Sequence, residues 1–131
     1  MKKLSTEVLV VGGGAAGLSA AAEAASAGAK VLVVESDLRP GGQLIKQTHK
    51  FFGSKDEYAG TRGFKIADIL LDEINSFKDS VSILQNSTVS GYYKEDDEFT
   101  AMRGEEEYFH IKAKKTIVAT GAQERLIPFP N

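Results

Sequence analysis

The stretch Glu7-Val-Leu-Val-Val-Gly-Gly-Gly-Ala-Ala-Gly17 decides how the rest of this sequence is interpreted. Its apolar part, Val8 to Val11, is a short β-branched run of the kind that a buried parallel strand uses. An alanine-rich segment, Ala15 to Ala27, follows it and is predicted to form a helix. Gly28 comes next, where a left-handed residue commonly ends a helix. The stretch therefore predicts a strand, a tight turn and a helix.

Three glycines around the turn, Gly12, Gly14 and Gly17, have the spacing G-x-G-x-x-G. In dinucleotide-binding proteins the first glycine permits the turn, the second lets the backbone approach a pyrophosphate, and the third lets helix and strand pack closely. The helix N-terminus, here at Ala15 and Ala16, then offers free N–H groups to the phosphates. The alternative is an ordinary β-α-β unit with a glycine-rich turn.

A second predicted strand, Lys30 to Val34, ends in Glu35, which is followed by Ser36. Glu35 lies 18 residues after Gly17, where the acid that hydrogen-bonds a ribose hydroxyl is expected. The position of this acid favours the dinucleotide interpretation over the ordinary β-α-β unit.

Residues 36–60 are predicted to form a long loop with a second glycine pair, Gly41-Gly42, followed by Gln43. The pair is either a plain turn after Pro40 or a second place where the backbone approaches a large cofactor. In the second case Gln43 would hydrogen-bond a polar ring edge.

The same loop contains Phe51-Phe52, which either covers the core or forms a wall beside an aromatic ring. His49 is interpreted as a surface residue. We therefore do not predict His49 to be a catalytic base.

The remainder of the chain predicts more of an open α/β sheet. Residues 61–78 have apolar side chains at helical spacing and are predicted to form a helix. Residues 80–85 are predicted to form the next strand. Its carboxyl end leads to Val89, at the edge of the sheet that faces the ligand. Three β-prone runs between residues 89 and 112 predict an antiparallel meander with acidic turns. A buried strand at residues 116–119 then leads to the turn Thr120-Gly121.

Composition limits the classes of protein that fit. The 131 residues are enough for one domain, and 16 basic against 18 acidic residues give no basic excess of the kind that nucleic-acid binding needs. The absence of cysteine excludes a disulfide, a cysteine zinc site and a redox-active cysteine pair in this chain. No apolar run approaches the 18 residues of a membrane span, and we expect a cytoplasmic protein without membrane or nucleic-acid partners.

Four features occur in order: the glycine fingerprint, Glu35, Gly41-Gly42, and Ala119-Thr120-Gly121 after an apolar strand. Together they resemble the N-terminal half of the FAD domain of flavoproteins with two dinucleotide-binding domains, the group that includes thioredoxin reductase and glutathione reductase. The resemblance covers nearly all of residues 5–131. It implies an α/β fold, a Rossmann-like FAD/NAD(P)-binding domain whose parallel sheet has a three-stranded antiparallel β-meander as a crossover.

Residues 40–44 and 119–130 look most like the amine-oxidising branch, which includes the sarcosine oxidase alpha subunit, opine oxidase and hydrogen cyanide synthase subunits. The resemblance implies a flavin-dependent oxidoreductase with FAD as cofactor and NAD(P)H as a candidate co-substrate. It implies these cofactor-binding residues: Gly12, Gly14, Ala15, Ala16, Gly17, Glu35, Ser36, Gly41, Gly42, Gln43, Val89, Ala119, Thr120 and Gly121.

Members of this group are longer, with an NAD(P)-binding domain and a later Gly-Asp motif that holds FAD. We therefore expect residues 1–121 to be a partial FAD-binding domain and residues 122–131 a linker toward a second domain. We also expect self-association or a partner subunit that supplies the rest.

Three functions remain open from the sequence: part of a flavoprotein oxidoreductase, an NAD-binding module, or a non-catalytic subunit. No general base, nucleophile or metal site is evident, and the substrate is not identified.

Overall fold

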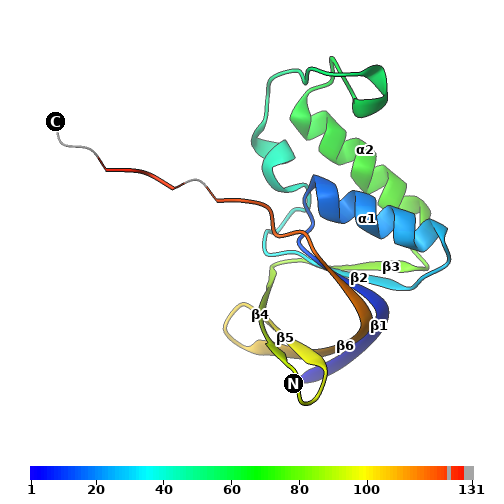
Figure 1. Ribbon diagram of the computed structural model, residues 1–131, viewed down its shortest axis with the longest axis vertical. Helices are drawn as coiled ribbons and strands as arrows, with labels where there is room; N and C mark the ends of the chain where they lie inside the picture. The colour runs from blue at the N-terminus through cyan, green and yellow to red at the C-terminus, as the bar shows by residue number, and fades with distance from the viewer. Residues whose placement is uncertain (124, 129–131) are drawn as a thin grey trace.

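The computed structural model describes residues 1–123 and 125–128, which form one mixed β-sheet with two α-helices (Figure 1). The strands lie in the order β3-β2-β1-β6-β5-β4. Their bounds are β1 Lys2–Val11, β2 Val31–Val34, β3 Val81–Leu84, β4 Ser87–Tyr93, β5 Glu98–Arg103 and β6 Glu107–Val118. The helices are α1 Ala15–Ser26 and α2 Gly63–Ser76, with the short 3₁₀ helices η1 Gly42–Lys46 and η2 Lys55–Glu57 between β2 and α2.

The parallel part of the sheet consists of β3, β2, β1 and β6, which pairs with β1 from Phe109 to Val118. Both α-helices lie on one face of it (Figure 1). Alternate strand residues such as Val10 and Val33 pack against Leu18 of α1 and Leu70 of α2, all of them buried. This confirms the predicted strand, turn and helix at the start of the chain, and the predicted helix at 61–78, which is shorter by two residues at each end.

The predicted antiparallel meander is confirmed: β4 pairs with β5, and β5 pairs with β6. The sheet curls, so that the meander covers the face opposite the helices (Figure 1). Its side chains Phe109 and Ile111 join Leu9 and Leu32 of the parallel strands in a second buried cluster. The meander thus provides the packing that a crossover helix would provide in a doubly wound sheet.

The prediction of a separate buried strand at residues 116–119 is wrong in two respects. Residues 107–118 form one continuous strand, which pairs with β5 as far as Lys112 and with β1 from Phe109 to Val118. The end of this strand is also exposed, with 37% of Ile117 and 70% of Val118 accessible. The reason is that pairing with β5 ends at Lys112, so residues 113–118 have β1 on one side and no described strand on the other.

β1 is longer than the apolar run Val8–Val11 that predicted it, because it pairs with β6 from Lys2 onward. The Glu7 carboxylate links β1 to neighbouring segments through two hydrogen bonds. Lys114 Nζ donates to its carboxylate over 2.9 Å, and the backbone N–H of Lys30 donates over 3.0 Å. These two hydrogen bonds, the first being the larger cause, lower the pKa of Glu7.

Among the described residues, no helix is both long and apolar enough to cross a membrane. The acidic turns at residues 95–97 and 104–106 are exposed, and the described chain contains no group of three His, Asp or Glu side chains placed to hold a metal ion. The predicted linker at 122–131 includes residues 124 and 129–131, which lie outside the described part; its described residues form no helix or strand.

Candidate functional site

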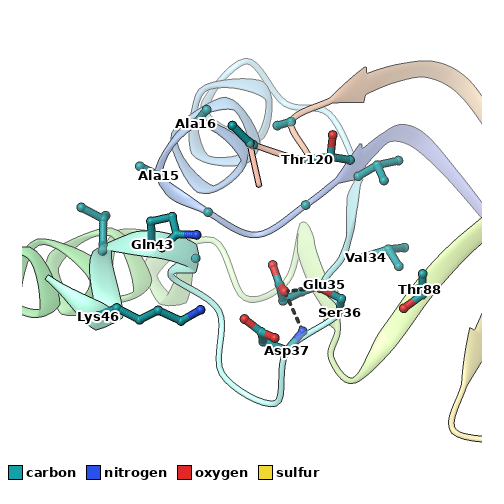
Figure 2. Close-up of a pocket in the computed structure, with 18 of the residues that line it drawn as sticks. Ala15, Ala16, Val34, Glu35, Ser36, Asp37, Gln43, Lys46, Thr88 and Thr120 are labelled. Atoms are coloured by element: carbon teal, nitrogen blue, oxygen red, sulfur yellow. Dashed lines mark hydrogen bonds between the residues drawn. The ribbon is translucent and has the colours of Figure 1, made fainter. Parts of the chain in front are cut away.

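A cavity of about 540 Å³ opens where β1, β2 and β6 end and α1 begins (Figure 2). This is the carboxyl edge of the parallel strands, where open α/β sheets bind their ligands. Its walls come from five parts of the chain: the glycine turn with the first turn of α1, the segment after β2, η1, the start of β4, and the segment after β6.

The glycine turn leaves no room for side chains. Gly12 has φ +104°, and a Cβ there would lie 2.3 Å from the carbonyl oxygen of Ala119. A Cβ on Gly17 would lie 1.8 Å from the carbonyl oxygen of Gly12. The turn therefore packs closely against α1 on one side and against the segment that follows β6 on the other. This packing places the start of α1 and residues 119–121 at the cavity.

α1 begins at the cavity without a side-chain cap. Its N-cap residue is Gly14, no side chain accepts a hydrogen bond from its first turn, and that turn carries no acidic residue. Ala15 and Ala16 line the cavity. The first N–H groups of a helix have no partner within the helix, so this end of the cavity offers donors and a partial positive charge to an anion.

The second glycine pair packs directly on the first turn. Gly41 donates its N–H to the carbonyl oxygen of Gly13 over 2.7 Å. Gly42 lies so close to Gly14 that a Cβ on Gly42 would be 2.9 Å from the Gly14 Cα. The two glycine motifs therefore form one backbone-lined wall, and only Gly42 of the pair faces the cavity.

Glu35 lies beside the glycine turn, directly after β2, and is 4% exposed (Figure 2). One carboxylate oxygen accepts the N–H of Gly13 over 2.6 Å. The other accepts the N–H of Asp37 over 2.7 Å and the hydroxyl of Ser36 over 3.2 Å. The carboxylate is thus held rigidly, and since each oxygen has two lone pairs it retains capacity to accept a further hydrogen bond from a ligand.

The structure brings most of the predicted site residues to one cavity. The following line it: Gly12, Gly14, Ala15, Ala16, Glu35, Ser36, Gly42, Gln43, Val89, Ala119, Thr120 and Gly121. Gly17 and Gly41 do not, because they lie behind the lining and pack against the Gly12 carbonyl and against Ile45 and Ala67.

Several lining residues were not predicted, and they include Asp37, Lys46, Gln47, Ser87 and Thr88. For Lys46 the sequence held no signal, because residues 36–60 were predicted to be a loop and the 3₁₀ helix η1 is seen only in the structure. In a 3₁₀ turn, residues three apart lie on the same side, and Lys46 is three residues after Gln43.

The two aromatic residues of the loop have different surroundings. Phe51 lines the cavity, packs against the core and stacks on His49 with ring centroids 5.3 Å apart. Phe52 is 91% exposed. Phe51 therefore combines the two roles that the sequence left open, since it covers part of the core and forms part of a cavity wall, while Phe52 does neither.

These residues fit a dinucleotide. Uncapped helix N–H groups suit a pyrophosphate, an adjacent buried carboxylate suits ribose hydroxyls, and the side-chain-free wall of Gly12, Gly14 and Gly42 leaves space for a close approach of the ligand. The cavity continues past this wall to Gln43 and Phe51, so there is also room beyond the pyrophosphate.

Comparison with known proteins agrees with this geometry. Residues 6–131 match the family described as pyridine nucleotide-disulphide oxidoreductase. The sarcosine oxidase alpha chain of Corynebacterium sp. (strain U-96) is 32% identical over 139 residues, which cover 96% of this chain and 14% of that protein. An opine oxidase subunit of Rhizobium meliloti is 30% identical over 135 residues, covering 95% of this chain and 24% of that protein.

The fold is also found in a solved structure. L-Proline dehydrogenase from P. horikoshii superposes with a TM-score of 0.81 at 23% identity, over 96% of this chain and 24% of that one. The chain thus corresponds in extent to about a quarter or less of each of these three larger proteins.

Proposed function

Because the chain belongs to the pyridine nucleotide-disulphide oxidoreductase family, we propose that it is the FAD-binding part of a flavin-dependent oxidoreductase that acts on amines or amino acids. The observation that carries the proposal is one cavity that joins the uncapped N-terminus of α1 to the buried Glu35 carboxylate. The names of the similar sarcosine and opine oxidase subunits support the substrate class.

Each wall of the cavity has a proposed task. The first N–H groups of α1, at Ala15 and Ala16, bind the pyrophosphate, which approaches over Gly14. Glu35 accepts hydrogen bonds from the adenosine ribose. Val89 lies against the adenine in this assignment.

At the other end of the ligand, Gly42 and Gln43 lie along its flavin side, and Ala119, Thr120 and Gly121 close over it. Phe51 adds an apolar wall there, which suits an aromatic ring.

When bound, FAD supplies the redox chemistry, since its ring system accepts hydride equivalents from a substrate or from NAD(P)H. The chain itself binds and orients the cofactor and excludes water from the buried side of the site. We assign it no catalytic residue. Substrate binding, and any use of NAD(P)H, would depend on parts of the longer protein or on a partner subunit.

A partner is consistent with the relatives, which are named as subunits of sarcosine oxidase and opine oxidase. The compartment that we propose is the cytoplasm.

The test is to purify the 131-residue chain, incubate it with FAD, remove free cofactor and record the absorption spectrum. We expect the visible bands of oxidised flavin to remain with the protein. A colourless protein that binds NADH would instead favour an NAD-binding module, which Glu35 also suits because it accepts unphosphorylated ribose. A protein that binds neither would contradict the proposal and favour a non-catalytic subunit.

A further inference from the structure

One charged residue of the cavity has no task in the proposal above. Of the described residues that line the cavity, Lys46 alone carries a positive charge, while Glu35 and Asp37 carry negative charges. A dinucleotide would add the two negative charges of its diphosphate to these carboxylates. Binding would therefore be opposed by like charges on one side of the ligand unless a cation is close by.

Lys46 is directed to this cavity by the way η1 is anchored. Leu44 is buried in the core and Ile45 packs against it, which holds one side of η1 on the protein. Gln43 and Lys46, three residues apart, are on the other side and both line the cavity. Figure 2 shows the Lys46 side chain extending from η1 toward the end of the cavity where Glu35 and Asp37 lie.

The Lys46 ammonium group is also available to a ligand. Within residues 1–123 and 125–128 the Lys46 side chain forms no ion pair, although other lysine and arginine side chains there do, and Lys46 is exposed. The ammonium group therefore forms no ion pair with Asp37 or Glu35. Lys46 lies on the same cavity wall as Gly42, and Gly42 packs against Gly14 at the start of α1.

We propose that Lys46 is a phosphate-binding residue of this site: its ammonium group contacts the diphosphate of the bound dinucleotide from the side opposite the N-terminus of α1. The inference rests on the proposed function, because it assigns a residue within the same cavity. It gives the diphosphate a positive charge on each side, one from the helix dipole and one from Lys46.

The experiment measures FAD binding by quenching of flavin fluorescence, and binding of ADP and adenosine by competition with FAD. The variants are Lys46→Met, Lys46→Arg as the charge-retaining substitution, and Lys50→Met as a matched control. Lys50 is an exposed lysine four residues away that does not line the cavity. Circular dichroism of each variant establishes that the fold is retained.

Lys46→Met is expected to weaken FAD and ADP binding by about five- to tenfold, with adenosine binding unchanged, because only the phosphates lose a partner. Lys46→Arg should bind ADP within about twofold of the unmodified chain, and Lys50→Met should equal it. Added salt should weaken FAD binding less in Lys46→Met than in the unmodified chain, since screening acts on the ion pair that the variant lacks.

Two results would overturn the inference while the proposed function stands: FAD binding by Lys46→Met equal to that of Lys50→Met, or an equal loss of ADP and adenosine affinity. If the unmodified chain binds no FAD, the proposed function itself fails, before any variant is compared.

Discussion

At the scale of single residues, Glu35 has a structural role and, in the proposed function, a ligand-binding role as well. Its carboxylate satisfies the N–H groups of Gly13 and Asp37, which come from the two segments that flank the cavity. Gly13 must be small for this, because a Cβ there would lie 2.8 Å from a Glu35 carboxylate oxygen. The acid is therefore positioned before any ligand arrives, which reduces the entropy lost on binding.

Glu35→Ala should weaken FAD binding by about 1–3 kcal/mol, because ribose hydroxyls lose a charged acceptor and backbone N–H groups lose their partner. Titration with FAD measures this. Asp72→Ala, which removes an exposed carboxylate of α2 outside the cavity, serves as the control and should leave the affinity unchanged. Equal affinity of Glu35→Ala and the unmodified chain would refute the assignment of the ribose to Glu35.

At the scale of elements, the contact between α1 and β1 determines the shape of the end of the cavity to which we assign the pyrophosphate. Small residues make this contact possible: Gly17, Ala21 and Ala22 are buried in the face of α1 that packs on the sheet. Gly17 does not touch the cavity, yet it places the start of α1 beside the Gly12 turn.

Gly17→Ala should therefore destabilise the cofactor-free chain, since the new methyl group would collide with the Gly12 carbonyl and only a backbone shift could relieve the collision. We expect a loss of about 2–3 kcal/mol, at the upper end for overpacking, measured by urea denaturation. Gly91→Ala is the matched control, because its nearest atom would be 3.5 Å away, and it should change stability by about 0.5 kcal/mol or less. Similar losses in both variants would argue against this packing role.

At the scale of the whole molecule, the described sheet is open along residues 113–118 of β6. An unpaired strand edge with exposed apolar side chains, here Ile117 and Val118, readily pairs with another chain. This edge lies beside the cavity, because Ala119 to Gly121 follow it directly. A strand added there would extend the sheet next to the cofactor site.

We accordingly expect the purified chain to associate with itself or with a partner subunit. Light scattering at micromolar concentration should give a mass above the 14.1 kDa of one chain. The double substitution Ile117→Lys and Val118→Lys should reduce self-association with little loss of stability, because both side chains are exposed and charged edge residues oppose pairing. A monomer of the unmodified chain would count against association through this edge.

The motifs and elements that depend only on residues nearby in the chain could be predicted from the sequence. The glycine spacing, the acid after β2 and the apolar periodicity of α2 depend on neighbours within a few turns or one β-α-β unit, so they can be recognised in the chain itself. The meander was predicted for the same reason, because its turns and β-prone runs are consecutive.

The errors lie where distant segments decide the outcome. Residues 116–119 are as apolar as a buried strand, and Val118 is exposed because the pairing of β6 with β5 ends at Lys112 and no other described strand replaces β5 there. Phe51 and Gly42 line the cavity, whereas their neighbours Phe52 and Gly41 do not. This difference likewise depends on which side of a loop packs on α2 and the core.

The sequence by itself determined a dinucleotide-type turn, the carboxylate 18 residues beyond it and the α/β order of elements, because these follow from spacing along the chain. Only the tertiary structure decided that both glycine motifs, Glu35 and the segment after β6 surround one cavity, that Lys46 faces it, and that β6 forms an open edge. These facts depend on contacts between segments up to about a hundred residues apart, which burial and backbone pairing establish and local sequence patterns do not contain.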